Sequence, residues 1–104
     1  MYVNKQPRRL AEHAVYFRAC QKISELAPLL GLLQESPPRS VIEIGTFQGG
    51  TLWAWCKVAQ DNARIVSIDL PDGKYGGGYP ASVGETVYAG YAERGQNLWL
   101  IRDD

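Results

Sequence analysis

The sequence has little of what builds a metal site or a disulfide framework. It contains one histidine, His13, and two cysteines, Cys20 and Cys56, which lie far apart and in no Cys-x-x-Cys spacing. A structural zinc site needs a set of closely spaced cysteine and histidine ligands, so no such site is expected. Without a disulfide framework a reducing compartment is the default, and we expect a cytoplasmic protein.

Net charge and long apolar runs are also absent. Eleven basic residues balance eleven acidic ones in a chain of 104 residues, so no electrostatic argument favours nucleic acid or an anionic membrane as a partner. No apolar run is long enough for a membrane span, and no apolar core of a secretion signal follows the charged N-terminus. The length and the 45% apolar content predict one soluble globular domain.

Two common nucleotide-binding motifs are missing, but a glycine turn is present. Val41 to Thr51 (VIEIGTFQGGT) joins a short apolar run to a helix-like segment. A strand, a glycine turn and a helix in succession bring backbone N–H groups up to a ligand. Phe47 stands where GxGxxG has its second glycine, and no GxxxxGK[ST] occurs, which disfavours a dinucleotide or a phosphate loop.

The remaining pattern alternates helices and strands. Helices are expected over 8–24 and 25–34, within a helical lead-in of 1–38, with His13 as a partly exposed helix residue. Ser82 and Glu85 form a possible capping box for a later helix. The other expected elements are a helix over 50–59 and strands over 41–44, 63–68 and 97–102. This order predicts an α/β fold with three parallel strands and right-handed crossovers over 39–104.

A loop over 70–80 contains four glycines and two prolines, which no regular element tolerates. It is either a surface connection or a flap over a ligand, because long loops in small domains are often functional. We keep both interpretations at this point.

Three features fall at the carboxyl ends of the three expected strands. They are the Gly45–Gly50 turn, Asp69, and the pair Asp103 and Asp104. Ligands of open α/β sheets bind at this edge. An acidic residue about twenty positions after the glycine turn can accept hydrogen bonds from a ribose diol, as Asp69 would. Together these features favour a ligand that contains a nucleoside.

These residues carry a resemblance to a known family. VIEIGTFQGGTLWAW followed by IVSIDL resembles motif I and the next acidic strand of class I S-adenosylmethionine-dependent methyltransferases. The segments GGTLWAWCKVAQDNARIVSIDLPDGKYGGGYP and GQNLWLIRDD are similar to the branch that includes cephalosporin hydroxylase-like proteins. The similarity covers residues 39–104.

The resemblance implies a position for each candidate site residue. Glu43 and the Gly45–Gly50 turn would face the methionine part of S-adenosylmethionine, and Asp69 would hold the ribose. Asp104, or as the less favoured alternative Asp103, would lie near the adenine amino group. Alternatives remain, because Glu43 can be a buried acid paired with a backbone N–H or an arginine, Asp69 a strand cap and Asp104 a disordered terminus. The residues expected to bind the cofactor are Glu43, Gly45, Thr46, Gly49, Gly50, Asp69 and Asp104.

Only the first part of the family's sheet is expected here, as a truncated Rossmann-like methyltransferase fold with strand order 3-2-1. The chain would be a truncated or partner-dependent methyltransferase with unknown catalytic residues and methyl acceptor. The alternative is a non-catalytic α/β assembly module with a relic cofactor loop. Because strand 41–44 would have an unpaired apolar edge, we expect a homo-oligomer, most simply a dimer through that strand or the apolar helices.

Overall fold

A computed structural model describes residues 6–17, 19, 21–46, 49–71 and 78–103. None of the helices in these ranges is long and apolar enough to cross a membrane. The elements follow the chain in the order α1 (Pro7–Tyr16), α2 (Ile23–Glu35), β1 (Ser40–Ile44), α3 (Gly50–Val58), β2 (Arg64–Asp69), α4 (Ala81–Thr86), the 3-10 helix η2 (Tyr88–Tyr91) and β3 (Asn97–Arg102).

The three strands form one parallel sheet in the order β1-β2-β3. Ser40 is paired with Arg64, and Arg64 with Asn97, so the strands begin level with one another. The expected α/β class and the expected sheet order are both confirmed. Each strand pairs with the next strand in the sequence, and the carboxyl ends of all three meet at one edge.

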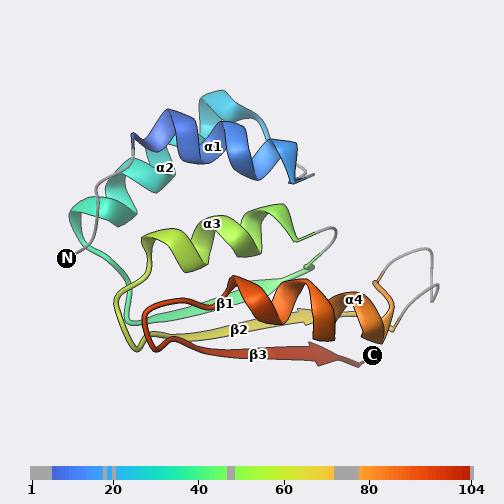
Figure 1. The fold of residues 1–104 in the computed structure, drawn as a ribbon. Helices are drawn as coiled ribbons and strands as arrows, with labels where there is room; N and C mark the ends of the chain where they lie inside the picture. Colours follow the sequence, from blue (N-terminus) through green and yellow to red (C-terminus); the bar gives the residue numbers. More distant parts are fainter. Residues whose placement is uncertain (1–5, 18, 20, 47–48, 72–77, 104) are drawn as a thin grey trace.

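The molecule has three layers, in which α3 and α4 lie on one face of the sheet and α1 and α2 lie over α3 (Figure 1). Helix α3 is therefore covered on two sides. Leu52 and Cys56 belong to the core against the sheet, whereas Trp53 and Val58 belong to the core against α1 and α2. The near absence of polar residues from α3 agrees with this double burial, since a helix that is apolar all round is a buried helix.

Both crossover helices lie on the same face because the strands are added in one direction across the sheet. A β1–α3–β2 unit and a β2–α4–β3 unit of the same hand place their helices on the same side. No described element lies against the other face in Figure 1. There Ile42 and Ile44 are 71% and 78% exposed, which is unusual because parallel sheets are normally buried on both faces.

The expected helix over 8–24 is wrong in its second half, because α1 ends at Tyr16 and α2 begins at Ile23. The chain turns where the amide of Ala19 donates to the carbonyl of Ala14 at 2.9 Å. Gly50 packs directly on this turn, since a Cβ atom on Gly50 would lie 2.3 Å from Ala19 N and 2.4 Å from Ala14 O. The break lets the amino end of α3 approach α1, a long-range contact that helical periodicity does not report.

The expected capping box is also wrong. Helix α4 begins at Ala81 with Pro80 as the N-cap residue, and no side chain caps it. Ser82 lies inside the helix, where its carbonyl accepts a hydrogen bond from Thr86 Oγ1 at 2.6 Å. Pro80 sets this start because its fixed φ is compatible with the residue that precedes a helix.

Candidate functional site

The carboxyl edge of the sheet brings Gly45 and Asp69 together. Ile44 is paired with Ile68, so the two residues follow the last paired positions of β1 and β2 side by side. The amide of Gly45 donates to Ile68 O at 2.7 Å, and the amide of Asp103 donates to Asp69 O at 3.0 Å. The ends of all three strands are thus joined by backbone hydrogen bonds, as the sequence had led us to expect. Asp104 lies outside the described residues.

The carboxyl group of Asp69 lies at the end of β2. Its Oδ1 accepts a hydrogen bond from the amide of Leu70 at 2.7 Å, and the residue is half-buried. This bond fixes the side chain beside the end of the strand, which agrees with the strand-cap interpretation. It is also compatible with ligand binding, because a carboxylate has about four acceptor positions.

The three described glycines of the turn differ in what surrounds them. Gly45 has φ +92°, and a Cβ atom there would have no neighbouring heavy atom within 4 Å. Gly49 has φ +86°, and its Cβ would lie 2.5 Å from the ring of Tyr88, while Gly50 meets α1 as described above. Gly45 therefore leaves space that a ligand can occupy, whereas Gly49 and Gly50 allow the chain to pack on itself. Residues 47 and 48 lie outside the described part.

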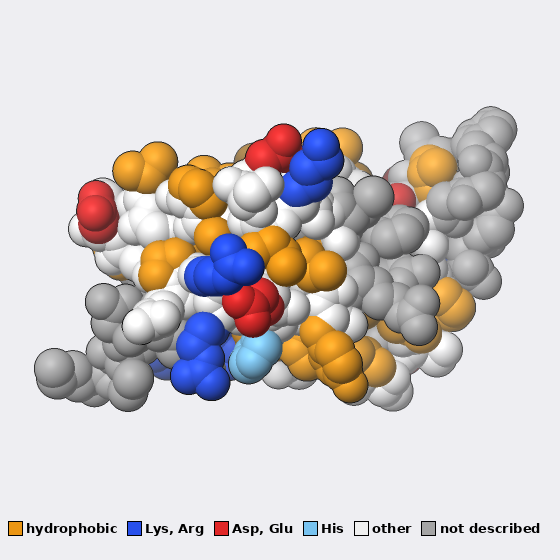
Figure 2. Space-filling view, turned by 90° about the horizontal axis from the view of Figure 1, so that it is seen from above, with side chains coloured by type: hydrophobic (Ala, Val, Ile, Leu, Met, Phe, Trp, Pro, Cys, Tyr) orange, Lys and Arg blue, Asp and Glu red, His pale blue; other side chains and the backbone are white. Residues whose placement is uncertain are grey.

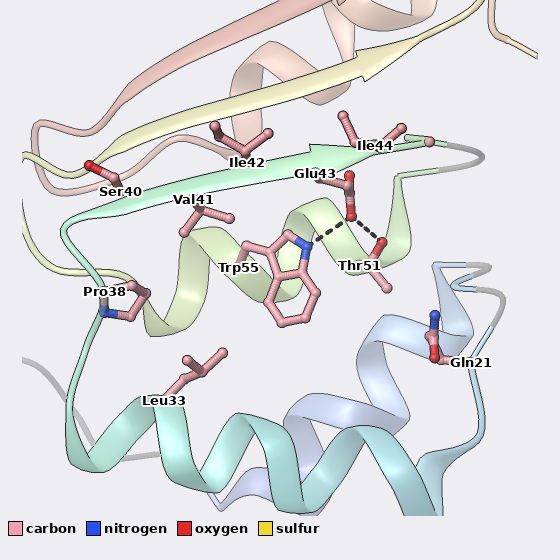
Figure 3. Close-up of a pocket in the computed structure, with 11 residues that line it drawn as sticks. Gln21, Leu33, Pro38, Ser40, Val41, Ile42, Glu43, Ile44, Thr51 and Trp55 are labelled. Carbon is pink, nitrogen blue, oxygen red and sulfur yellow. Dashed lines mark hydrogen bonds between the residues drawn. The ribbon is translucent and has the colours of Figure 1, made fainter.

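Glu43 points toward α3 and is held there by three side chains (Figure 3). Its Oε2 accepts hydrogen bonds from Thr51 Oγ1 at 2.6 Å and from Trp55 Nε1 at 2.8 Å. Its Oε1 accepts one from Ser67 Oγ at 2.9 Å. The buried-acid interpretation of Glu43 thus gains a set of partners, but they are hydroxyl and indole groups and not the backbone N–H or arginine considered from the sequence.

Thr46 extends this network beneath the glycine turn. Its side chain is buried, and its Oγ1 lies 2.6 Å from Ser67 Oγ, which in turn donates to Glu43. A chain of hydrogen bonds thus joins the turn after β1, the middle of β2 and the first two turns of α3. Such a network fixes the position of the turn, because each polar group inside it has a specific partner.

A pocket of about 500 Å³ lies beside Glu43, along the free edge of β1 (Figure 3). This volume is within the range of small-molecule sites, about 300–1,000 Å³. Glu43, Gly45 and Thr51 come from the predicted turn and its surroundings. Strand β1 lines the pocket along its length. Four further residues were not expected from the sequence and come from α2, α3 and the segments before and after α2: Gln21, Leu33, Pro38 and Trp55. These residues come together only in the folded chain, so no local signal in the sequence could have identified them.

Buried tyrosines support the turn from below. The rings of Tyr79 and Tyr88 pack edge to face with centroids 4.9 Å apart, and Tyr88 lies 5.8 Å from Tyr91. Burial, with smaller contributions from the two neighbouring phenols, raises the pKa of Tyr88 to about 12. These rings fill the space under Gly49 and were not recognised from the sequence, where they resemble ordinary loop and helix residues.

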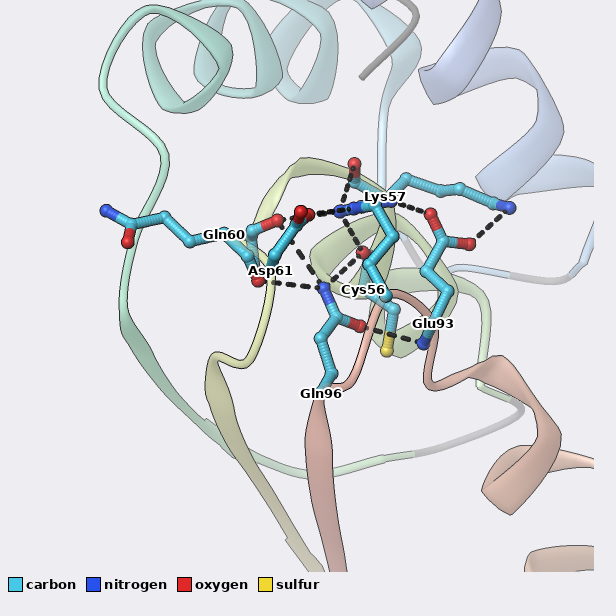
Figure 4. A network of polar contacts seen from close by, with 8 residues as sticks. Cys56, Lys57, Gln60, Asp61, Glu93 and Gln96 are labelled. Carbon is cyan, nitrogen blue, oxygen red and sulfur yellow. Dashed lines mark hydrogen bonds and ion pairs between the residues drawn. The ribbon is translucent and has the colours of Figure 1, made fainter. Parts of the chain in front are cut away.

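A second polar network holds the opposite end of α3 (Figure 4). Gln96 Nε2 donates to Cys56 O at 2.9 Å, and Arg94 Nη2 donates to Ala59 O at 2.7 Å. Lys57 pairs with Glu93 at 2.7 Å, and Glu93 also contacts Arg94. These side chains satisfy helix carbonyls that have no partner within the helix. The network therefore has a structural explanation and lies away from the candidate site.

The single histidine does not join the candidate site. His13 is exposed on α1, as expected, with its ring 5.7 Å from that of Trp53. The flap interpretation of the loop over 70–80 concerns mainly residues 72–77, which lie outside the described part of the chain.

Comparison with known proteins adds no residue to the site, since no family model and no curated protein matches this sequence.

Proposed function

We propose that the chain binds S-adenosylmethionine at the carboxyl edge of its sheet, as the cofactor-binding part of a truncated or partner-dependent methyltransferase. The observation that carries this proposal is the position of Asp69 directly beside Gly45, at the point where α3 begins. An acid at the end of the second strand is placed to accept hydrogen bonds from a ribose diol. Gly45 leaves its own side of the turn open for the rest of the ligand.

The residues of the turn would have different tasks in this function. Gly45 would present backbone to the methionine part, and Asp69 would bind the ribose hydroxyls. Glu43 and Thr46 would act as positioning residues, because their side-chain oxygens already bind Thr51, Trp55 and Ser67. The bound cofactor supplies an activated methyl group. The chain's own residues bind and orient it, which is the larger part of catalysis when two reactants must meet in line.

Ligand titration tests this proposal. S-adenosylhomocysteine, added at millimolar concentration, is expected to raise the melting temperature, because a ligand that binds only the folded state stabilises it. Asp69→Ala is expected to abolish the shift. Asp61→Ala is the matched control, since it removes an exposed carboxylate at the opposite end of β2. A shift that survives Asp69→Ala, or no shift with the unmodified protein, contradicts the proposal.

A non-catalytic assembly module is the second candidate function. It is favoured by the internal use of Glu43 and Thr46 and by the large apolar side chains exposed on the sheet. We had expected self-association through strand 41–44 or through the apolar helices, and this remains a proposal. The free edge of β1 would present the backbone of Ser40, Ile42 and Ile44, because Arg39 and Gly45 turn theirs toward β2.

A further inference from the structure

The uncovered side of the sheet carries a continuous apolar patch. The register places Ile42, Val66 and Trp99 in one row across the three strands, and Ile44, Ile68 and Ile101 in the next. Four of these side chains are 43% to 78% exposed, and the other two are half-buried. We call these six residues the open face. Apolar side chains gathered in this way mark an interaction surface more often than single exposed ones do.

The rows that border the open face carry opposite charges at opposite ends. At the amino ends of the strands the row is Ser40, Arg64 and Asn97. Beyond the carboxyl ends, alternation along β3 places Asp103 on the same side as Trp99 and Ile101. Both Arg64 and Asp103 are exposed. The open face thus has an apolar centre, a basic end and an acidic end.

The geometry points to a second copy of this chain as the occupant of the open face, packed face to face with its strands running in the opposite direction. A two-fold axis that crosses the strands between the two apolar rows exchanges those rows. The row of Ile42 then lies over the row of Ile44 in the other copy, and the end with Arg64 lies over the end with Asp103. An axis parallel to the strands would place Arg64 over Arg64, so charge selects the first arrangement.

Face-to-face packing covers the open face, which pairing through the edge of β1 would leave exposed. Edge pairing about a two-fold axis would join two sheets side by side and keep both open faces in water. Face-to-face packing instead buries the apolar rows between sheets about 10 Å apart, as in a β-sandwich. The open face is thus an alternative contact surface to strand 41–44 and the apolar helices, and dimer formation through it does not depend on cofactor binding.

The size of the open face predicts a weak dimer. Strands about 4.8 Å apart that rise about 3.3 Å per residue give a patch of roughly 200 Å² in projection. Stable dimers bury about 800 Å² on each partner, so the apolar rows form only the centre of such an interface. We accordingly expect a dissociation constant in the micromolar range, with the charged ends as the rim.

Sedimentation velocity over a range of concentrations tests the contact surface. Trp99→Thr combined with Ile101→Thr is expected to weaken the dimer at least about tenfold, because both changes lie on β3 and remove open-face area. Leu32→Thr is the matched control, since Leu32 is 65% exposed on α2, and it should leave the dimer unchanged. Ser40→Pro removes an outward N–H from the edge of β1 and should also have no effect.

Charge exchange tests the direction of packing. Arg64→Glu and Asp103→Arg are each expected to weaken the dimer several-fold, and the variant that carries both is expected to recover it. A chain that stays monomeric at micromolar concentration with a cooperative melt would overturn the proposal. A dimer lost in Ser40→Pro or Leu32→Thr but kept in the β3 variant would assign the contact to the edge or to α2 instead.

Discussion

The two faces of the sheet differ in an unexpected way, because the covered face contains polar side chains and the exposed face contains apolar ones. The face against the helices contains Glu43 and Ser67, which belong to the hydrogen-bond network under the glycine turn. The face without helices carries only apolar side chains in its two central rows. The outer side of the helix layers, by contrast, mixes charged and apolar residues as an ordinary protein surface does (Figure 2). The buried polar groups of one face hold the glycine turn in position, whereas the exposed apolar groups of the other face are suited to contact with a second chain.

The largest expected difference between the faces is in packing energy. Ile65→Ala on the covered face should cost about 3 kcal/mol of unfolding free energy, because Ile65 is fully buried and its loss leaves a cavity. Ile42→Ala, the same kind of change at a side chain 71% exposed, should cost less than about 1 kcal/mol. Urea unfolding at submicromolar concentration, where a weak dimer dissociates, measures both values. Equal costs would show that the open face is covered within one chain.

The polar network of the covered face should give the next largest effect. Glu43→Leu removes the acceptor of three hydrogen bonds and leaves Thr51, Trp55 and Ser67 without it. We expect a loss of about 1–2 kcal/mol, because the half-buried donors of Thr51 and Trp55 lose their partner while Ser67 Oγ keeps its contact with Thr46. Glu43→Gln keeps one acceptor oxygen and should lose less. Urea unfolding of both variants gives the comparison, and an equal loss would mean that only the volume of the side chain matters.

Alkaline pH should also lower the stability, and it should act through groups on the covered side of the sheet. Burial raises the pKa of the Cys56 thiol from 9.0 to about 12, and that of Tyr88 from 10.0 to about 12. The folded chain therefore holds these protons at pH values where the unfolded chain releases them. The contribution of these two groups to stability should be constant below about pH 8 and should fall as pH rises above about 9, because the unfolded state then binds fewer protons than the folded state.

Urea midpoints measured between pH 7 and pH 11 check this dependence. Cys56→Ala should remove the part of the decline that begins near the ordinary thiol pKa of 9.0, while the later decline due to Tyr88 remains. A midpoint that stays level up to pH 11 would contradict the burial of both groups.

The strands could be predicted from the sequence because they depend on local information, whereas their order was expected only from the resemblance to methyltransferases. Ile42 and Ile65 belong to short apolar runs, and Gly45 and Asp69 end them, so a parallel α/β arrangement followed from alternation with helices. The end of α1 could not be predicted in this way. It depends on Gly50, more than thirty residues later in the sequence, which packs against Ala14 and Ala19.

The candidate site was predictable only in part for a similar reason. Gly45 and Asp69 carry a recognisable spacing, and the structure places them together. The partners of Glu43 carry no such signal, because Thr51, Trp55 and Ser67 are ordinary residues until α3 packs on the sheet. The open face was missed because it depends on the tertiary arrangement, in which two crossovers of one hand cover only one side of the sheet.

The order of the strands also has a consequence for how the chain reaches its fold. Each strand pairs with the next one in the sequence, so no strand has to wait for a distant segment. Parallel pairings that span a crossover form slowly, and synthesis delivers the amino-terminal elements first. β1 and β2 can therefore pair while β3 is still being made. The side chains of Ile42, Ile44, Val66 and Ile68 would then face solvent before the sheet is complete, so we expect this chain to need chaperones early in its synthesis.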